Sequence, residues 1–170
     1  MADPTGNAAF SFDVKEGEKL VKGGYAIAVI AAIAAVLSGH LAILAVSALA
    51  VLVALHYGPM ANPKRPQLVV LEDGLVVDGL GLLPWETIAS VQRTESYVRT
   101  VASVELHVAT RAPVKASVRP QTSLSPMRRV QTMIWSLPDP ARLKLKIGSL
   151  KGIEAIEPAI RAHLPPAAAA

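Results

Sequence analysis

The stretch Gly23–Gly58, GGYAIAVIAAIAAVLSGHLAILAVSALAVLVALHYG, contains no Lys, Arg, Asp or Glu. As one straight helix it would be about 54 Å long at the usual rise per residue, far longer than a hydrocarbon core of about 30 Å. The turn-forming sequence SGH at residues 38–40 divides it into two apolar arms, each close to the length of one crossing. The stretch therefore predicts a transmembrane helical hairpin over 23–58, with helices at about 23–38 and 41–57.

Basic residues flank this hairpin at its two chain ends. Lys15, Lys19 and Lys22 precede the first arm, Lys64 and Arg65 follow the second, and the turn between the arms carries no fixed charge. Because Lys and Arg close to membrane helices favour the cytoplasmic side, both chain ends are expected to lie there. The flanks thus predict a multi-pass membrane protein with cytoplasmic N- and C-termini.

Two other interpretations of the apolar stretch stay open. The first arm has the length of a signal-peptide core, although its leader is long and contains Asp3, Asp13, Glu16 and Glu18, which do not fit the signal-peptide pattern. Each arm is also slightly shorter than the ~20 residues of a full span, so the arms could dip into the bilayer and return on the same side.

Alanines four residues apart recur within both arms. Small residues at this spacing permit close contact between membrane helices, but a general abundance of alanine would produce the same pattern. The pairs are Ala28/Ala32, Ala31/Ala35 and Ala50/Ala54.

The rest of the chain has an ordinary soluble composition. The 170 residues are 52% hydrophobic, and the excess lies in the hairpin, whereas residues 59–170 carry fourteen basic and nine acidic residues. A basic region beside a bilayer is expected to face anionic lipid headgroups, and the scarcity of aromatic residues gives no sign of base stacking, so no nucleic-acid partner is predicted. The predicted segments besides the hairpin are a cytoplasmic N-terminal segment 1–22, a linker 59–66, a β domain 67–164 and a disordered tail 165–170.

No catalytic or metal-binding pattern is present in the sequence. Cysteine is absent, which excludes disulfides, thiolate metal sites and Cys nucleophiles. The four His residues lack the H-E-x-x-H spacing, and no Gly-rich loop is followed by Lys and Ser or Thr. We therefore expect a protein that is not an enzyme and that uses no cofactor and no metal.

Alternating apolar and polar residues in the second half of the chain are typical of β-strands. In QLVVLEDGLVVDG (67–79) two runs rich in β-forming residues flank Asp73-Gly74, a pair that suits the turn of a two-residue hairpin. In ASVELHVA the alternation places His107 on the solvent side. The other predicted strands are IASVQRTESYV (88–98), ASVELHVA (102–109), VKASV (114–118) and RLKLKI (142–147).

The end of the chain changes to a helical period. Ile153, Ile156, Ile160 and Leu164 recur at the spacing of one helix face. Pro158 lies within this pattern, and proline is tolerated best in the first turn of a helix. The sequence therefore predicts a short turn followed by a helix that begins at about Pro158 and closes the domain.

The order of these patterns resembles the bacterial pleckstrin-homology-like (PH-like) domains of small membrane proteins with a two-helix anchor. The likeness is carried by LVVLEDGLVVDG, then LPWETIASV, and finally RLKLKIGSL running into GIEAIEPAIRAHL. It implies an α+β protein, a two-helix transmembrane hairpin followed by a PH-like β-barrel or sandwich that a C-terminal helix closes. Structural roles fall on Asp73, Gly74, Pro84, Trp85 and Ile88, with Trp85 packing over one end of the barrel.

Two surfaces are candidates for contact with other molecules. The first is basic: alternation puts Arg142, Lys144 and Lys146 on one side of a strand, joined by Lys115 and Arg119 on a neighbouring one, and it predicts contact with lipid headgroups. A solvated strand face is the alternative.

The second surface has apolar residues at near-helical spacing with two arginines between them. This combination suits a membrane interface or a partner groove, and the alternative is an excursion that packs onto its own domain. Its residues are Met127, Arg128, Arg129, Val130, Met133, Ile134 and Trp135.

These patterns predict an interaction protein. We expect a non-enzymatic integral inner-membrane protein whose cytoplasmic PH-like module assists the assembly, scaffolding or regulation of a membrane protein complex, as some related proteins do for membrane energy-conversion complexes. Its expected partners are membrane lipids and an unidentified membrane protein or complex, and a homo-oligomer is compatible with the same patterns. The alternative is an accessory component of an envelope transport or lipid-handling system, with an apolar ligand held in the barrel.

Overall fold

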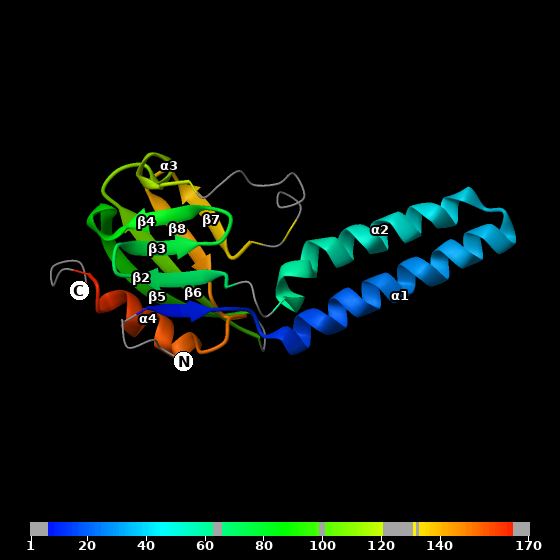
Figure 1. The fold of residues 1–170 in the computed structure, drawn as a ribbon, viewed down its shortest axis with the longest axis horizontal. Coiled ribbons are helices and arrows are strands. Elements are labelled where there is room, and N and C mark those ends of the chain that lie inside the picture. Colours follow the sequence, from blue (N-terminus) through cyan, green and yellow to red (C-terminus); the bar gives the residue numbers. More distant parts are fainter. Residues whose placement is uncertain (1–6, 63–65, 99–100, 121–130, 132, 165–170) are drawn as a thin grey trace. The chain divides into compact units, whose positions relative to one another are not determined.

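A computed structural model of the chain describes residues 7–62, 66–98, 101–120, 131 and 133–164. The chain forms two compact units: a helical unit of residues 12–62 with residue 131, and a β unit that takes in residues 7–11 and the described residues from 66 to 120 and from 133 to 164. The α+β class is confirmed, because the chain has two long apolar helices, two antiparallel sheets and a C-terminal helix (Figure 1).

The helical unit is a pair of helices joined by a tight turn (Figure 1). Helix α1 spans Val14–Ser38, α2 spans Leu41–Tyr57, and the short 3-10 helix η1 spans Gly58–Ala61. The turn uses Gly39 at φ +68°, a conformation that glycine adopts without strain. Helix α1 starts earlier than the apolar pattern predicts, because its polar first turns consist mostly of good helix formers.

Small residues fill the contact between α1 and α2. Ser47 Oγ donates a hydrogen bond to the carbonyl oxygen of Ala28 at 2.8 Å, which ties the two helices together. Small side chains let helix backbones approach closely. The structure therefore has the close contact that the alanine spacing predicts, although Ala32 is only half-buried. The buried alanines are Ala28, Ala31, Ala35, Ala50 and Ala54.

The large aliphatic side chains of both helices point away from this contact. Ile30, Val36 and Leu41 are 67%, 80% and 81% exposed. In the described part of the chain, two helical stretches, Gly17–Ser38 and Leu41–Ala61, are long and apolar enough to cross a membrane. Within the most apolar 18-residue segment of each stretch, only 22% and 11% of the residues are buried. The core helix of a soluble protein is mostly buried.

The first sheet of the β unit is antiparallel and has the order β1-β2-β3-β4 (Figure 1). In β2, and in β3 after Gly74, the buried residues alternate with half-buried ones, and the cross-strand pairs Leu68↔Val77 and Val70↔Leu75 put the buried set on one face. Its strands are β1 (Ala8–Phe10), β2 (Leu68–Leu71), β3 (Gly74–Val77) and β4 (Gly81–Pro84).

The predicted hairpin is present, but its turn lies one residue earlier than predicted. Leu71 pairs with Gly74, so the two-residue loop is Glu72 and Asp73, and Gly74 is the first residue of β3. The prediction that Gly74 serves the turn is wrong. It is needed instead because β4 passes close by: a Cβ at Gly74 would lie 2.5 Å from the carbonyl oxygen of Leu83.

Strand β1 was not predicted from the sequence. Its three residues pair with β2 in the register Ala8↔Val70 and Phe10↔Leu68, and Phe10 is buried. The chain therefore begins the first sheet, leaves it for α1 and α2, and returns to it at β2. A part of the predicted N-terminal segment 1–22 thus belongs to the β unit.

The second sheet is also antiparallel, with the order β5-β6-β8-β7 (Figure 1). The 3-10 turn η2 (Trp85–Thr87) leads from β4 into the first of these strands. Strand β5 runs along β6 over its whole length, whereas β8 pairs only with the stretch of β6 from Glu105 to Ala109. The strands are β5 (Ile88–Val98), β6 (Val101–Thr110), β7 (Trp135–Asp139) and β8 (Arg142–Lys146).

The strand predicted for VKASV is wrong. These residues form the single helical turn α3 (Val114–Ser117), in which the Ser117 amide donates to the Pro113 carbonyl at 3.1 Å and the Val118 amide to the Val114 carbonyl at 3.0 Å. Five residues with apolar first, third and fifth positions fit one helical turn as well as a strand. The helical turn is favoured because it buries Val114 and begins directly after Pro113.

The closing helix is present, but the prediction that it begins at about Pro158 is wrong. Helix α4 spans Ile153–Arg161 and contains Pro158 in its interior. An interior proline costs about 3 kcal/mol. Full burial of Ile156 and Ile160 against the sheets, each contributing about 2 kcal/mol, offsets that cost.

The core of the β unit consists of aliphatic side chains from both sheets and α4. Because each strand alternates, every second residue points to the interior. The following core side chains are fully buried: Leu68, Val70, Leu75, Val77, Leu83, Ile88, Val91, Leu106, Val108, Leu143, Leu145, Ile147, Ile156 and Ile160.

Candidate functional site

The outward face of β8 carries the basic residues that the sequence predicts there. Leu143 and Leu145 are buried, so Arg142, Lys144 and Lys146 must point to the other side of the strand. The register places Lys144 opposite His107 and Lys146 opposite Glu105 on β6. We call this set, Glu105, His107, Arg142, Lys144 and Lys146, the β8 face.

Carboxylates neutralise part of the positive charge on the β8 face. Lys144 Nζ lies 2.7 Å from Glu105 Oε2, and Arg142 Nε lies 3.2 Å from Asp139 Oδ2. His107 Nε2 lies 3.6 Å from the same Glu105 oxygen. Within the described residues Lys146 is exposed and has no ion pair. This side chain is therefore the cation of the β8 face that is most available to an anion.

Lys115 and Arg119 do not lie on a strand beside β8, so this part of the predicted basic surface is wrong. Lys115 belongs to α3 and lines a shallow hollow with Pro113 and Pro138. Arg119 forms an isolated backbone bridge with Leu82 of the first sheet. The two side chains are thus held by different elements and do not extend the alternation of β8.

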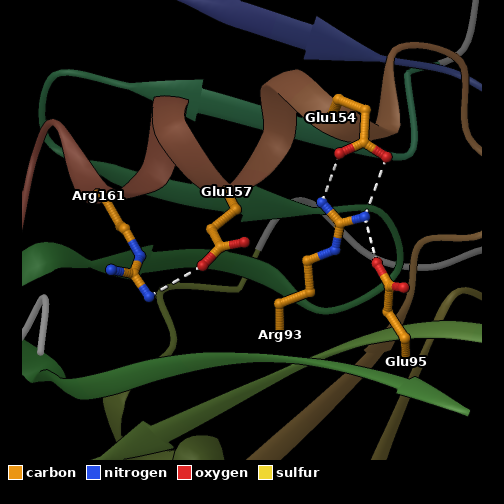
Figure 2. Close-up of polar contacts among 5 residues, drawn as sticks. All are labelled: Arg93, Glu95, Glu154, Glu157 and Arg161. Carbon is orange, nitrogen blue, oxygen red and sulfur yellow. Dashed lines mark hydrogen bonds and ion pairs between the residues drawn. The ribbon is translucent and has the colours of Figure 1, made fainter.

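A second charged group joins α4 to β5 (Figure 2). Arg93 donates from Nη1 and Nη2 to the two carboxylate oxygens of Glu154 at 2.7 and 3.0 Å, and from Nη2 to Glu95 at 2.6 Å. The Arg93 side chain is only 18% exposed. Figure 2 also shows the neighbouring pair on α4, Arg161 and Glu157, at 2.9 Å. The forked pairing links α4 to β5.

This pairing shifts the pKa values of Arg93 and Glu154. The hydrogen bonds from Arg93 lower the pKa of Glu154 below its ordinary value, because they stabilise the carboxylate. The hydrogen bonds to Glu154 and then Glu95 raise the pKa of Arg93 further. The group therefore stays ionised across the physiological range, and its role is to hold α4 rather than to transfer protons.

Sequence reasoning missed this group. Arg93 and Glu154 are 61 positions apart, and no local pattern connects them. One signal was available: Arg93 lies on the same face of β5 as Val91, where alternation predicts an interior residue. A charged residue at an inward position usually has an opposite charge nearby.

Trp85 contacts its own domain through both its polar and its apolar atoms. Its Nε1 donates to the carbonyl oxygen of Leu71 at 2.9 Å, and its ring stacks on His163 with centroids 5.2 Å apart and planes at 3°. Pro84 and Ile88 beside it are buried, while Asp73 is exposed in the hairpin turn. These contacts hold the segment around Trp85, the first hairpin and the residues that follow α4 together.

The predicted interface from Met127 to Trp135 is described only at its end. Met127, Arg128, Arg129 and Val130 lie outside the described residues. Ile134 is buried, and Trp135 begins β7 and donates from Nε1 to the Asp78 carbonyl at 3.0 Å. The sulfur of Met133 lies close to Gly79. The described part therefore packs onto the β unit, and Trp135 does not continue a helix.

The arrangement of charges suits binding of anionic groups. Among the described residues, no group of three or more His, Asp or Glu side chains could hold a metal ion. The β8 face instead offers one exposed ammonium beside two ion pairs, which is a weak site for a phosphate or a carboxylate group.

No protein-family model, curated protein or solved structure matches this chain. Its function therefore has to be inferred from its own residues: the apolar helices, the strand that precedes them and the charges of the β unit.

Proposed function

We propose that this chain is an integral protein of the bacterial inner membrane, in which α1 and α2 cross the bilayer and the β unit is a cytoplasmic PH-like module that binds a membrane protein partner. In this proposal the protein performs no catalysis. It assists the assembly, scaffolding or regulation of a membrane protein complex.

The distribution of side-chain sizes in the helical unit carries the proposal. Alanines are buried between the helices, while large residues such as Ile30, Val36 and Leu37 are exposed. Water would favour the opposite arrangement, because exposed aliphatic surface is costly and soluble monomers expose apolar patches of only a few hundred Å². In lipid there is no such cost, and small residues give the closest helix packing.

Strand β1 supports an even number of crossings. It pairs with β2 in one sheet, and α1 and α2 lie between the two strands in the chain. Both ends of the hairpin must therefore reach the same side of the membrane. Lys19 and Lys22 before the hairpin favour the cytoplasmic side.

The same strand is evidence against a cleaved signal peptide. Cleavage after α1 would remove β1, expose the edge of β2, and uncover Leu68, which pairs with the buried Phe10. An exposed, apolar strand edge promotes aggregation. Retention of Ala8–Phe10 keeps this strand edge covered.

The β unit suits an interaction role better than storage of an apolar ligand. Two four-stranded antiparallel sheets closed by α4 are compatible with the PH-like resemblance. Fully buried aliphatic side chains such as Leu75, Leu106 and Leu145 occupy its interior. A lipid-carrying barrel would need that space for its ligand.

Purification of the tagged full chain in a mild detergent tests the partner proposal. Mass spectrometry should find a membrane protein in stoichiometric amount, and the same tag on an unrelated two-helix membrane protein is the control for non-specific capture. Recovery of lipid inside the β unit with no protein partner would contradict the proposal and favour the lipid-handling alternative.

A further inference from the structure

A groove runs along the helical unit between α1 and α2. It has a volume of about 390 Å³ and is lined by Gly23, Gly24 and Ile27 of α1 and by Leu49, Ala50 and Val53 of α2, with Lys19 at one end. The α1 residues that line it, from Lys19 to Ile27, span about 12 Å along the helix axis. This is the shape of a slot for a hydrocarbon chain with a cation at its mouth.

The two neighbouring glycines of the groove have different explanations. Gly24 is required by the helix contact, because a Cβ there would lie 3.0 Å from the Cβ of Ala54. A Cβ at Gly23 would meet no atom within 4 Å. Helix packing therefore does not require glycine at this position. Glycine also weakens a helix by about 1 kcal/mol relative to alanine, so its presence here has a cost that packing does not explain. Its missing side chain leaves the groove open.

The charges at the mouth of the groove point to an anionic occupant. Lys22 is paired with Glu18 at 3.1 Å, whereas the Lys19 side chain lines the groove itself. We propose that this groove binds one acyl chain of an anionic phospholipid, with its phosphate held by Lys19. The inference rests on the proposed insertion of α1 and α2 into the membrane.

A second copy of the chain fits this groove less well. Two copies inserted in the same direction and packed groove to groove would bring their Lys19 ammonium groups to the same depth, where like charges repel. A phospholipid instead supplies a negative phosphate at the mouth and an apolar chain along the slot. The cytoplasmic leaflet, where the lysine end is expected to lie, is also the leaflet that holds anionic lipids.

Lipid retention by the full chain tests this inference. The protein is reconstituted in nanodiscs of phosphatidylglycerol and phosphatidylcholine with identical acyl chains, released, and examined by native mass spectrometry. The wild type is expected to retain one phosphatidylglycerol in preference to phosphatidylcholine. Lys19→Gln should reduce retention of phosphatidylglycerol about fivefold, the effect of one cation near an anionic surface, and leave phosphatidylcholine unchanged.

Matched variants distinguish the loss of lipid binding in the groove from a general effect of the same type of substitution elsewhere on α1. Gly23→Leu fills the slot and should abolish retention of both lipids, whereas Ala26→Leu, at an exposed position of α1 outside the groove, should not. Lys22→Gln removes a neighbouring lysine that does not line the groove and should retain phosphatidylglycerol as the wild type does.

Three results would overturn the inference. They are equal retention of the two lipids by the wild type, equal effects of Lys19→Gln and Lys22→Gln, and a dimer that Gly23→Leu dissociates. Extraction of the wild-type chain from native membranes by alkaline carbonate would instead refute the membrane insertion on which the groove depends, so the two failures can be told apart.

Discussion

At the scale of single residues, the charged contacts of α4 are the feature with the clearest dependence on pH. Arg93 holds Glu154 through two hydrogen bonds, and Glu154 therefore has a pKa below its ordinary value of about 4.5. A carboxylate whose pKa is lower in the folded state stabilises the fold above the pKa of the unfolded chain. That stabilisation is lost as the pH falls through the folded-state pKa.

Glu154→Gln should lower the stability of the β unit at pH 7, and the difference from the wild type should shrink as the pH falls below about 4.5. Both tryptophans, Trp85 and Trp135, lie in the β unit, so their fluorescence during urea unfolding in detergent micelles reports on this unit. Glu157→Gln is the control, because Glu157 pairs within α4 and does not join it to β5. A difference that does not vary with pH would contradict the account.

Gly74 allows a second test at this scale. Gly74→Ala should destabilise the β unit by about 1–3 kcal/mol, since the added methyl group would overlap the Leu83 carbonyl of β4. Asp73→Ala, in the exposed turn beside it, should change stability by less than about 0.5 kcal/mol. The same urea unfolding measures both, and equal effects would contradict the account that β4 leaves no room for a Cβ at Gly74.

At the scale of elements, the sequence predicted what long or strongly alternating patterns specify. The apolar arms, β6 and β8 are where residue spacing predicts them, and β5 is where its residue content and its position in the chain predict it. The strand prediction for VKASV is wrong because five residues are too few to distinguish the pattern of a strand from that of one helical turn. The start of α4 was misplaced because the sequence shows the cost of Pro158 but not the burial of Ile156 and Ile160 that offsets it.

Strand β1 could not be predicted from its own residues. AAF is three residues long and has no turn signal or alternation. It becomes a strand only because the edge of β2 accepts its backbone, and Gln67 donates from its backbone amide to the carbonyl of Phe10 at 2.8 Å. Such a strand forms because of contacts between distant parts of the chain, which no local pattern reveals. The ion pair between Arg93 and Glu154 also joins residues that are far apart in the sequence.

The contribution of β1 can be measured directly. Phe10→Ala should destabilise the β unit by about 3 kcal/mol, because it empties a buried position of the sheet. Ala9→Ser, on the exposed side of the same strand, should change stability by less than about 0.5 kcal/mol. If Phe10→Ala unfolds at the same urea concentration as the wild type, β1 does not contribute to the β unit.

At the scale of the whole molecule, the path of the chain links the helical hairpin to the β unit. The hairpin is an insertion between β1 and β2, so in the proposed membrane arrangement the first sheet is complete only when both ends of the hairpin emerge on one side of the bilayer. The sequence predicted the hairpin and its orientation from the flanking lysines. It did not predict this coupling, which depends on β1.

The central claim is that α1 and α2 cross the inner membrane and return, and single-cysteine labelling tests it most directly because the chain contains no cysteine. His40→Cys places a thiol in the turn between the helices without disturbing Gly39, and Glu72→Cys places one in the exposed turn between β2 and β3. In intact spheroplasts, a membrane-impermeant maleimide should label His40→Cys, and it should label Glu72→Cys only after lysis. Labelling of Glu72→Cys in intact spheroplasts, or protection of His40→Cys until lysis, would contradict the account.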